Sequence, residues 1–299
     1  MNTMNSDQGS VLTLGKRFAL WILWIIAAVA LLYRPSLALV HYSLTNDNAS
    51  HLILIPFLSA YVFYVDRARI FPVLSISPLW GAILFTFGSL TLLAGRVSGD
   101  RLTTVDRLSL YSLTLVLFWA AGFAALFGKL ALQRAAFPLL FLLFMIPLPD
   151  EFLEKVIYYL QAGSADVAQW AFDVFRVPAM RDGFIFHLAR VNIEVAKECS
   201  GIRSSLALLI LATLVAHFLL QRTWSKVTFV AVGMLIMVVK NGIRIATLTM
   251  LAQYVDPGFL FGRLHHQGGV VFFLIGLALL LPVYWLLRRL EQQPAPAEV

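Results

Sequence analysis

The sequence predicts an all-α membrane protein with about eight transmembrane helices, and two features of its composition support this fold class. Hydrophobic residues make up 60% of the 299 residues and charged residues only 13%. A soluble domain carries roughly 25% charged residues, because it must cover its whole surface with polar groups. The charged residues also fall in short groups between long apolar runs. Lipid is therefore the expected environment of most of the chain.

Eight apolar runs approach the length of about 20 residues that a helix needs to cross roughly 30 Å of hydrocarbon. They cover residues 18–40, 51–65, 76–95, 108–127, 134–148, 203–221, 227–250 and 269–287. The second and fifth runs are short, and the fifth contains Pro138 and ends at Pro147 and Pro149. Either run is expected to be tilted, broken or re-entrant.

The basic residues between the runs predict the orientation. With the N-terminus in the cytoplasm, every inside segment is basic: Lys16, Arg17, Arg67, Arg69, Lys129, Arg134, Arg222, Lys226, Arg288 and Arg289. Because the net charge of +7 is spread over these groups, it does not indicate binding of nucleic acid. The outside loop at 96–107 is a mild exception, since Arg96, Arg101 and Arg107 are only partly offset by Asp100 and Asp106.

This orientation predicts cytoplasmic tails at 1–16 and 291–299 and one membrane domain at 17–290. Within this domain, residues 149–200 form a segment on the extracytoplasmic side of the membrane. The first part of that outside segment has apolar residues at the spacing of an amphipathic helix, Trp170 and Val174 among them, and Gln161 is one of the polar residues between them. This helix is expected in one piece or in two pieces broken at Gly163, lying on the membrane surface or on the helix bundle. Further on, Val191, Ile193 and Val195 alternate with Asn192, Glu194 and Ala196, and residues 184–188 precede them after the turn-like Arg181-Asp182-Gly183. They predict a short β-hairpin that leads into Cys199.

The only cysteine of the chain, Cys199, comes just before the sixth apolar run. A single cysteine excludes an internal disulfide, so its thiol is either inert packing or a reactive group. A position at a helix N-terminus favours the thiolate, because free backbone N–H groups and the positive end of the helix dipole point there. For a lone cysteine the packing interpretation is the commoner one.

Arg244 lies in the seventh run, about 27 Å above the cytoplasmic Lys226 at 1.5 Å per residue. It is therefore expected near the outer edge of the hydrocarbon, at the depth of Cys199. Asn241, three residues earlier on the same face, is placed to orient its guanidinium. The competing interpretation is an arginine that extends to the interface to keep its charge in water.

His265 and His266 come directly before the last run, again at the outer boundary. Histidine has an unperturbed pKa suited to proton transfer near neutrality. Each histidine alone is more commonly an interfacial polar residue. A zinc site is not expected, since adjacent histidines on a helix point to different faces, and one cysteine with one histidine gives too few ligands.

Together, the three positions offer a nucleophile, a fixed cation and an acid/base at one face of the membrane. Acyl transfer needs a thiolate to attack a carbonyl, a donor for the oxyanion and a proton donor for the leaving amine. Cys199, Arg244 and His265 match these roles in that order. Secondary candidates lie beside them in the sequence: Glu198, Ser200, Arg203, Asn241 and His266.

The same residues resemble the signature blocks of the exosortase/archaeosortase family. The blocks are Cys-Ser-Gly-x-Arg-Ser at 199–204, Asn-x-x-Arg at 241–244 and His-x-x-x-Gly at 265–269, in the family's order and spacing. When residues 269–273 are aligned with the corresponding residues of the family, His265, and not His266, takes the position of the family histidine. Ser50-His51 and the Ile-Pro-Leu-Pro run at 146–149 also look like family features.

The resemblance implies a membrane-embedded cysteine peptidase/transpeptidase of the inner membrane, with Cys199, Arg244 and His265 as its active site. Its implied partners are exported proteins with a C-terminal sorting signal of the PEP-CTERM type, and a surface polysaccharide or lipid as acceptor. No cofactor or metal is implied.

Two other classes of function compete with this interpretation. Arg203, Lys240 and Arg244 are cations near or inside the membrane, as in transporters and channels. A transport path predicts polar residues across several spans, yet the cytoplasmic halves of the sixth and seventh runs are almost wholly apolar, with Thr213 and His217 as exceptions. A non-catalytic subunit of polysaccharide export would keep the fold without needing the thiol.

Overall fold

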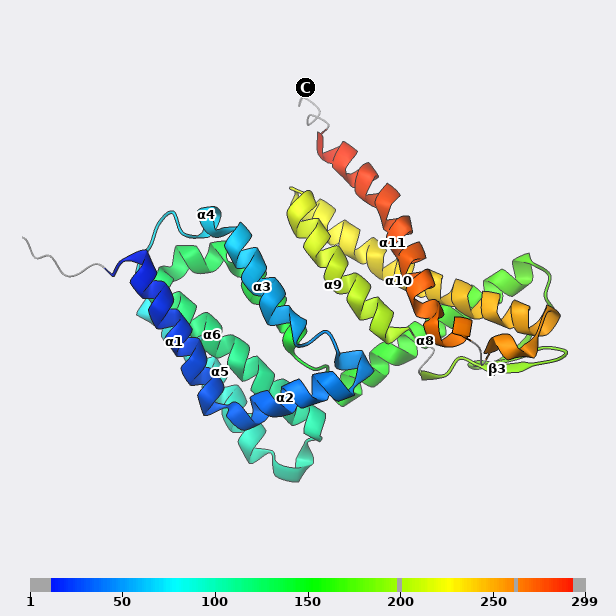
Figure 1. Ribbon diagram of the computed structural model, residues 1–299, viewed down its shortest axis with the longest axis horizontal. Helices are drawn as coiled ribbons and strands as arrows, with labels where there is room; N and C mark the ends of the chain where they lie inside the picture. Colours follow the sequence, from blue (N-terminus) through cyan, green and yellow to red (C-terminus); the bar gives the residue numbers. More distant parts are fainter. Residues whose placement is uncertain (1–11, 198–200, 261–262, 293–299) are drawn as a thin grey trace, which may run out of the picture. The chain divides into compact units, whose positions relative to one another are not determined.

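The computed structural model describes residues 12–197, 201–260 and 263–292; of Asp100, Leu260 and residues 263–269 it describes only the backbone. Its contacts divide the chain into two compact units, Met1–Asp150 and Glu151–Val299 (Figure 1). Within the described residues, seven helices are long and apolar enough to cross a membrane. The helices Ala136–Met145 and Asp150–Val174 pass the same test only when taken together. The all-α membrane fold is therefore confirmed.

The first unit contains four of the seven membrane-length helices. Its elements are α1 Leu14–Leu31, α2 Tyr33–Thr45, η1 Asp47–Ala49, α3 Leu54–Val65, α4 Arg67–Ile70, α5 Pro78–Val97, η2 Gly99–Arg101, α6 Thr104–Arg134, α7 Ala136–Phe141 and η3 Leu142–Met145. Helices α1 and α5 both pack along α6, the longest helix of this unit (Figure 1).

The first apolar run, expected as one helix over 18–40, is two helices that meet at Leu32. The Leu32 backbone has φ −109° and ψ 33°, outside the helical range. Pro35 explains the break, because it has no N–H to bond the carbonyl of Leu31 and is tolerated only in the first turn of a new helix. The fifth run is likewise broken into α7 and η3, as its prolines predict.

Aromatic side chains form the centre of the first unit, where α1 meets α6. Phe18 and Trp21 of α1 lie against Phe127 and Phe123, with ring centroids 5.1 Å and 5.2 Å apart. Phe123 and Phe127 stack on each other at 4.8 Å. These rings contribute through buried area and through edge-to-face geometry, so they set the spacing of the two helices.

Helix α6 is kinked at Gly128, whose φ of 90° and ψ of 172° are not helical. The kink interrupts the regular hydrogen bonding of the helix, so nearby carbonyls need other donors. Ser77 N donates to Ala125 O at 3.3 Å and Ser75 N to Phe127 O at 3.4 Å. Arg17 Nη1 donates to Leu126 O at 2.5 Å and to Ser75 O at 2.9 Å.

The second unit holds a long first helix, a small sheet and three membrane-length helices. Its elements are α8 Asp150–Val174, β1 Met180–Asp182, β2 Ile185–His187, β3 Asn192–Glu194, α9 Ile202–Leu219, α10 Thr223–Tyr254, η5 Pro257–Leu260 and α11 Arg263–Gln292. Helix α10 packs against both α9 and α11 (Figure 1).

Helix α8 runs unbroken through Gly163, so the expected break into two pieces is wrong. Gly163 is required by packing: a Cβ atom there would lie 2.7 Å from Val238 Cγ1 of α10. The buried face of α8 also differs from the expected apolar stripe. It consists of Ile157, Gln161, Ser164, Ala165, Ala168, Ala171 and Phe172, whereas Trp170 and Val174 are exposed.

The expected hairpin before Cys199 is present and has one more strand than expected. Strands β1, β2 and β3 form an antiparallel sheet in that order. Arg181 and Asp182, expected in a turn, belong to β1, because the turn falls at Gly183 and Phe184 between the paired Asp182 and Ile185. Phe186 of β2 is fully buried and packs on Phe172 of α8 with ring centroids 5.3 Å apart.

We expect Arg17→Met to destabilise the first unit. Arg17 is 3% exposed and gives its hydrogen bonds to the carbonyls of Leu12, Ser75 and Leu126. Leaving a buried acceptor without its donor costs about 1–3 kcal/mol. The free energy of unfolding should fall by at least about 2 kcal/mol, measured as a lower thermal midpoint in detergent.

The matched control is Lys16→Met, which removes the same predicted cytoplasmic charge from the neighbouring exposed side chain. It should leave the midpoint nearly unchanged. Equal effects of the two substitutions would mean that Arg17 acts only through its charge.

Candidate functional site

The structure describes some of the predicted site residues and not others. Cys199, Glu198 and Ser200 lie outside the described residues, and so do the side chains of His265 and His266, whose backbone belongs to the first turns of α11. Arg203 is exposed at the start of α9, and Arg244 is partly buried on α10. Asn241 is 1% exposed, one helical turn before Arg244. The site is therefore built here from the residues that surround the Cys199 segment in sequence.

Helix α9 begins at Ile202, directly after Gly201. Gly201 has φ 73° and ψ 16°, the left-handed conformation that costs other L-residues about 1–2 kcal/mol. A Cβ atom at Gly201 would also lie 2.8 Å from Asn241 Oδ1. The absence of a side chain at Gly201 thus lets the start of α9 contact the Asn-x-x-Arg block of α10.

Asn241 connects this contact to α8. Its Nδ2 donates to Ser164 Oγ at 3.0 Å, and the Ser164 side chain is fully buried. The two helices approach closely at Gly242, where a Cβ atom would lie 2.5 Å from Val167 Cβ and 2.7 Å from Ser164 O. A buried polar side chain needs such partners, because desolvation without a hydrogen bond is unfavourable. Asn241 is therefore held between Gly201 and Ser164.

The chain that enters the Cys199 segment is held by the same helix. Gln161 Nε2 of α8 donates to Val195 O at 2.7 Å, and both residues are buried. Further along, Lys197 Nζ pairs with Glu154 Oε1 at 3.1 Å, but both side chains are more than 60% exposed, so this pair contributes little. Residues 195 and 201, on either side of the segment, are thus each held through a buried amide side chain.

Lys240 directly precedes Asn241 on α10 and contacts both α9 and α11. Its Nζ donates to Ser204 Oγ of α9 at 2.5 Å, and the residue is 2% exposed. A Cβ atom at Gly276 of α11 would lie 3.3 Å from Lys240 Cδ, so the aliphatic stem packs against that helix. Hydrogen bonds to charged groups are stronger than neutral ones, and this bond stabilises the α9–α10 contact.

The described residues contain no group of three His, Cys, Asp or Glu side chains arranged to hold a metal ion. The side chains of Cys199, His265 and His266 do not belong to the described residues.

The sequence matches the family description of a transmembrane exosortase over residues 42–282. The chain belongs to the transmembrane exosortase family. Comparison with curated proteins and with solved structures returned no match. The matched range extends over parts of both units of this exosortase and includes positions 199, 241–244 and 265–269.

The sequence does not identify two α8 residues that support the candidate site, Gln161 and Ser164. It places Gln161 among the polar residues of the predicted amphipathic helix and gives Ser164 no role. The available signal was the small-residue character of Gly163, Ser164 and Ala165, which is typical of close helix contacts in membranes. The role of Asn241 in orienting Arg244 stays a prediction, since the hydrogen bond given above for Asn241 leads to Ser164 of α8.

We expect Gly201→Ala to destabilise this exosortase more than Gly183→Ala does. Both glycines have positive φ, 73° and 57°, so both substitutions add about 1–2 kcal/mol of backbone strain. Only Gly201 has a neighbour that a methyl group would strike, since nothing lies within 4 Å of a Cβ atom at Gly183. The comparison of thermal midpoints therefore isolates the Gly201–Asn241 contact, and equal midpoints would contradict it.

Proposed function

We propose that this exosortase is a cysteine peptidase/transpeptidase of the inner membrane. It cleaves the C-terminal sorting signal of exported proteins, of the PEP-CTERM type, at the outer face of the membrane. Cys199 forms a thioester with the substrate, Arg244 stabilises the oxyanion and His265 transfers protons. The acceptor that resolves the thioester is water or a surface polysaccharide or lipid.

The observation that supports this proposal is the contact between Gly201 and Asn241. It brings the start of α9, two residues after Cys199, against the helix that carries Arg244. Arg244 lies one turn beyond Asn241 on α10, about 4.5 Å along the helix axis. Two of the three sequence blocks thus meet in one unit of the fold, and the Asn-x-x-Arg block also contacts α8.

In the proposed reaction the Cys199 thiolate attacks the carbonyl carbon of the scissile peptide bond. The new C–S bond gives a tetrahedral intermediate whose oxyanion lies against the Arg244 guanidinium. The C–N bond then breaks, and the amine leaves with a proton from the imidazolium of His265. The acceptor loses a proton to His265 as it attacks the thioester, which restores the thiolate and releases the acylated product.

We further propose that both termini lie in the cytoplasm and that Cys199 faces the outside. The basic loops support this orientation, since Lys and Arg accumulate in cytoplasmic loops. The hydrogen bond between Asn241 and Ser164 then lies in the outer half of α10, where α8 contacts it.

Cys199→Ala should abolish processing, because no other thiol is present to attack the substrate. The protein should remain folded and inserted, because alanine is also a small side chain. The measurement is cleavage of a co-expressed exported protein with a C-terminal sorting signal. Cys199→Ser should be nearly as inactive, since a hydroxyl there stays protonated.

Normal cleavage by Cys199→Ala would remove the catalytic proposal and favour a non-catalytic assembly role.

The same variant is the unlabelled control in a test of orientation. A membrane-impermeant maleimide applied to intact spheroplasts should label the wild type and leave Cys199→Ala unlabelled. A cytoplasmic position of residue 180 in reporter fusions would overturn the orientation.

Arg244→Lys should reduce the processing rate about 10²-fold or more, as expected for loss of an oxyanion donor. Lysine keeps the charge but lacks the planar fork of donors that holds a thiolate and an oxyanion together. Arg203→Lys is the matched control on the exposed first turn of α9, and it should have the smaller effect. Full processing by Arg244→Lys with an inactive Arg203→Lys would place the catalytic cation on α9.

A further inference from the structure

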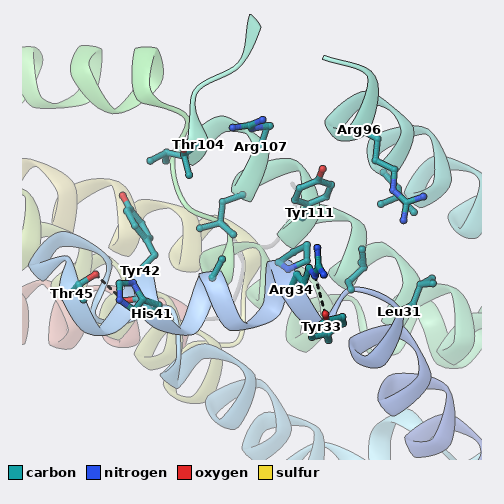
Figure 2. Close-up of a pocket in the computed structure, with 16 residues that line it drawn as sticks. Leu31, Tyr33, Arg34, His41, Tyr42, Thr45, Arg96, Thr104, Arg107 and Tyr111 are labelled. Atoms are coloured by element: carbon teal, nitrogen blue, oxygen red, sulfur yellow. Dashed lines mark hydrogen bonds between the residues drawn. The ribbon is translucent and has the colours of Figure 1, made fainter. Parts of the chain in front are cut away.

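A cavity of about 750 Å³ lies within the first unit, at the ends of four helices. It is formed where α1 meets α2, by the last turn of α5 and by the first turns of α6 (Figure 2). Its size is in the range of small-molecule sites in proteins. The proposed catalytic residues all belong to the other unit.

The side chains that line the cavity include an apolar and a basic group. Leu31, Leu32, Leu92, Val105 and Leu108 make up its apolar lining. Arg34 of α2, Arg96 of α5 and Arg107 of α6 also line it, and Figure 2 shows them around the ring of Tyr111. None of the lining residues is acidic. The cavity therefore combines three positive charges with a hydrocarbon-like surface.

The three arginines are not neutralised by carboxylates within the described side chains. The two ion pairs found there involve Arg181 and Lys197, both in the other unit. Arg34 Nε donates to the Tyr33 hydroxyl at 2.8 Å, and Arg107 Nη1 to Gly99 O at 3.4 Å. Like charges that converge in one cavity repel each other, so an anion between them is favourable.

The nearest carboxylate in the sequence, Asp106, is engaged elsewhere. Its oxygens accept from Thr103 N at 3.3 Å and from Asp150 N at 3.0 Å, as part of the cap that starts α6. Tyr42, which lines the cavity, has a raised pKa because of its burial and the negative charge of Asp150. Its phenol therefore stays protonated and can donate to an anion.

The position of these arginines in the chain is also unusual. Arg96 and Arg107 flank the loop that departs from the distribution of basic residues expected for an outer loop. Arg34 lies just after the break at Leu32, in the first turn of α2, where the first membrane-length helix has ended. A single arginine at the interface is explained by its long side chain reaching water. Three that converge from three helices on one cavity call for a shared ligand.

We propose that this cavity binds one anionic phospholipid of the membrane leaflet at this end of the helices. Its phosphate lies between Arg34, Arg96 and Arg107, and the start of an acyl chain lies against the apolar lining. Guanidinium groups match phosphate oxygens in pairs, and basic pockets between membrane helices suit lipid head groups. The apolar lining favours a lipid over free phosphate, which would leave these side chains in contact with water.

The test is native mass spectrometry of the full chain in detergent, titrated with dioleoyl phosphatidylglycerol or dioleoyl phosphatidylcholine. One phosphatidylglycerol should bind at least about tenfold more tightly than phosphatidylcholine, a difference worth 1.4 kcal/mol. The triple variant Arg34→Gln, Arg96→Gln, Arg107→Gln should lose that preference. Bound lipid should also raise the thermal midpoint of the wild type by mass action.

The control triple variant is Arg67→Gln, Arg69→Gln, Arg134→Gln, which removes the same charge from residues of this unit that do not line the cavity. It should keep the preference. Ala38→Trp fills the cavity from α2 with all arginines intact, and it should weaken phosphatidylglycerol binding about tenfold or more.

Three results would overturn the proposal. The first is equal affinity for the two lipids in the wild type. The second is an undiminished preference in the cavity triple variant or in Ala38→Trp. The third is equal thermal stabilisation by inorganic phosphate at the same concentration, which would assign the arginines to a free anion instead of a lipid. Since no readout depends on peptide cleavage, the result is independent of the function proposed for Cys199.

Discussion

Every polar backbone group within an apolar span of this protein must find its partner inside the protein, because hydrocarbon offers none. The kink of α6 at Gly128 shows how strongly this constraint shapes the first unit. The carbonyls of Ala125, Leu126 and Phe127 accept from Ser77, Arg17 and Ser75, all of them outside α6. The kink, the loop before α5 and the start of α1 therefore depend on one another. The Arg17 side chain joins all three through its hydrogen bonds.

The same constraint explains where hydroxyl and amide side chains are buried. Ser59 Oγ donates to Pro138 O and Ser109 Oγ to Pro147 O, each at 2.7 Å, beside prolines that interrupt regular hydrogen bonding. In the second unit Gln161 donates to Val195 O in the non-helical stretch before Cys199. Irregular backbone is thus held by side chains from neighbouring helices, and the candidate site lies next to one such stretch.

The cations of this chain have different structural settings, although the sequence treats most of them alike as topological signals. Arg17 is buried and bonds carbonyls of the α6 kink, whereas its neighbour Lys16 is exposed. Lys240 is buried and bonds Ser204, which ties α10 to α9. Arg34, Arg96 and Arg107 converge on one cavity. Lys and Arg residues therefore serve both to orient the chain in the membrane and to form specific hydrogen bonds inside the fold. The burial of each side chain in the structure distinguishes the two roles.

The sequence by itself determined the membrane class, the approximate helix count, the hairpin before Cys199 and the family, because apolar length, strand alternation and short motifs are local properties of the chain. Only the tertiary structure decided that Gly163 lies within a continuous helix, that Arg17 bonds α6, and that Asn241 lies between Gly201 and Ser164. These facts depend on which helix faces which, and helices related by long-range packing leave no periodic trace in the sequence. The close approach of α8 to α10 at Gly242 is possible because glycine has no Cβ atom, and only the neighbouring helix reveals that requirement.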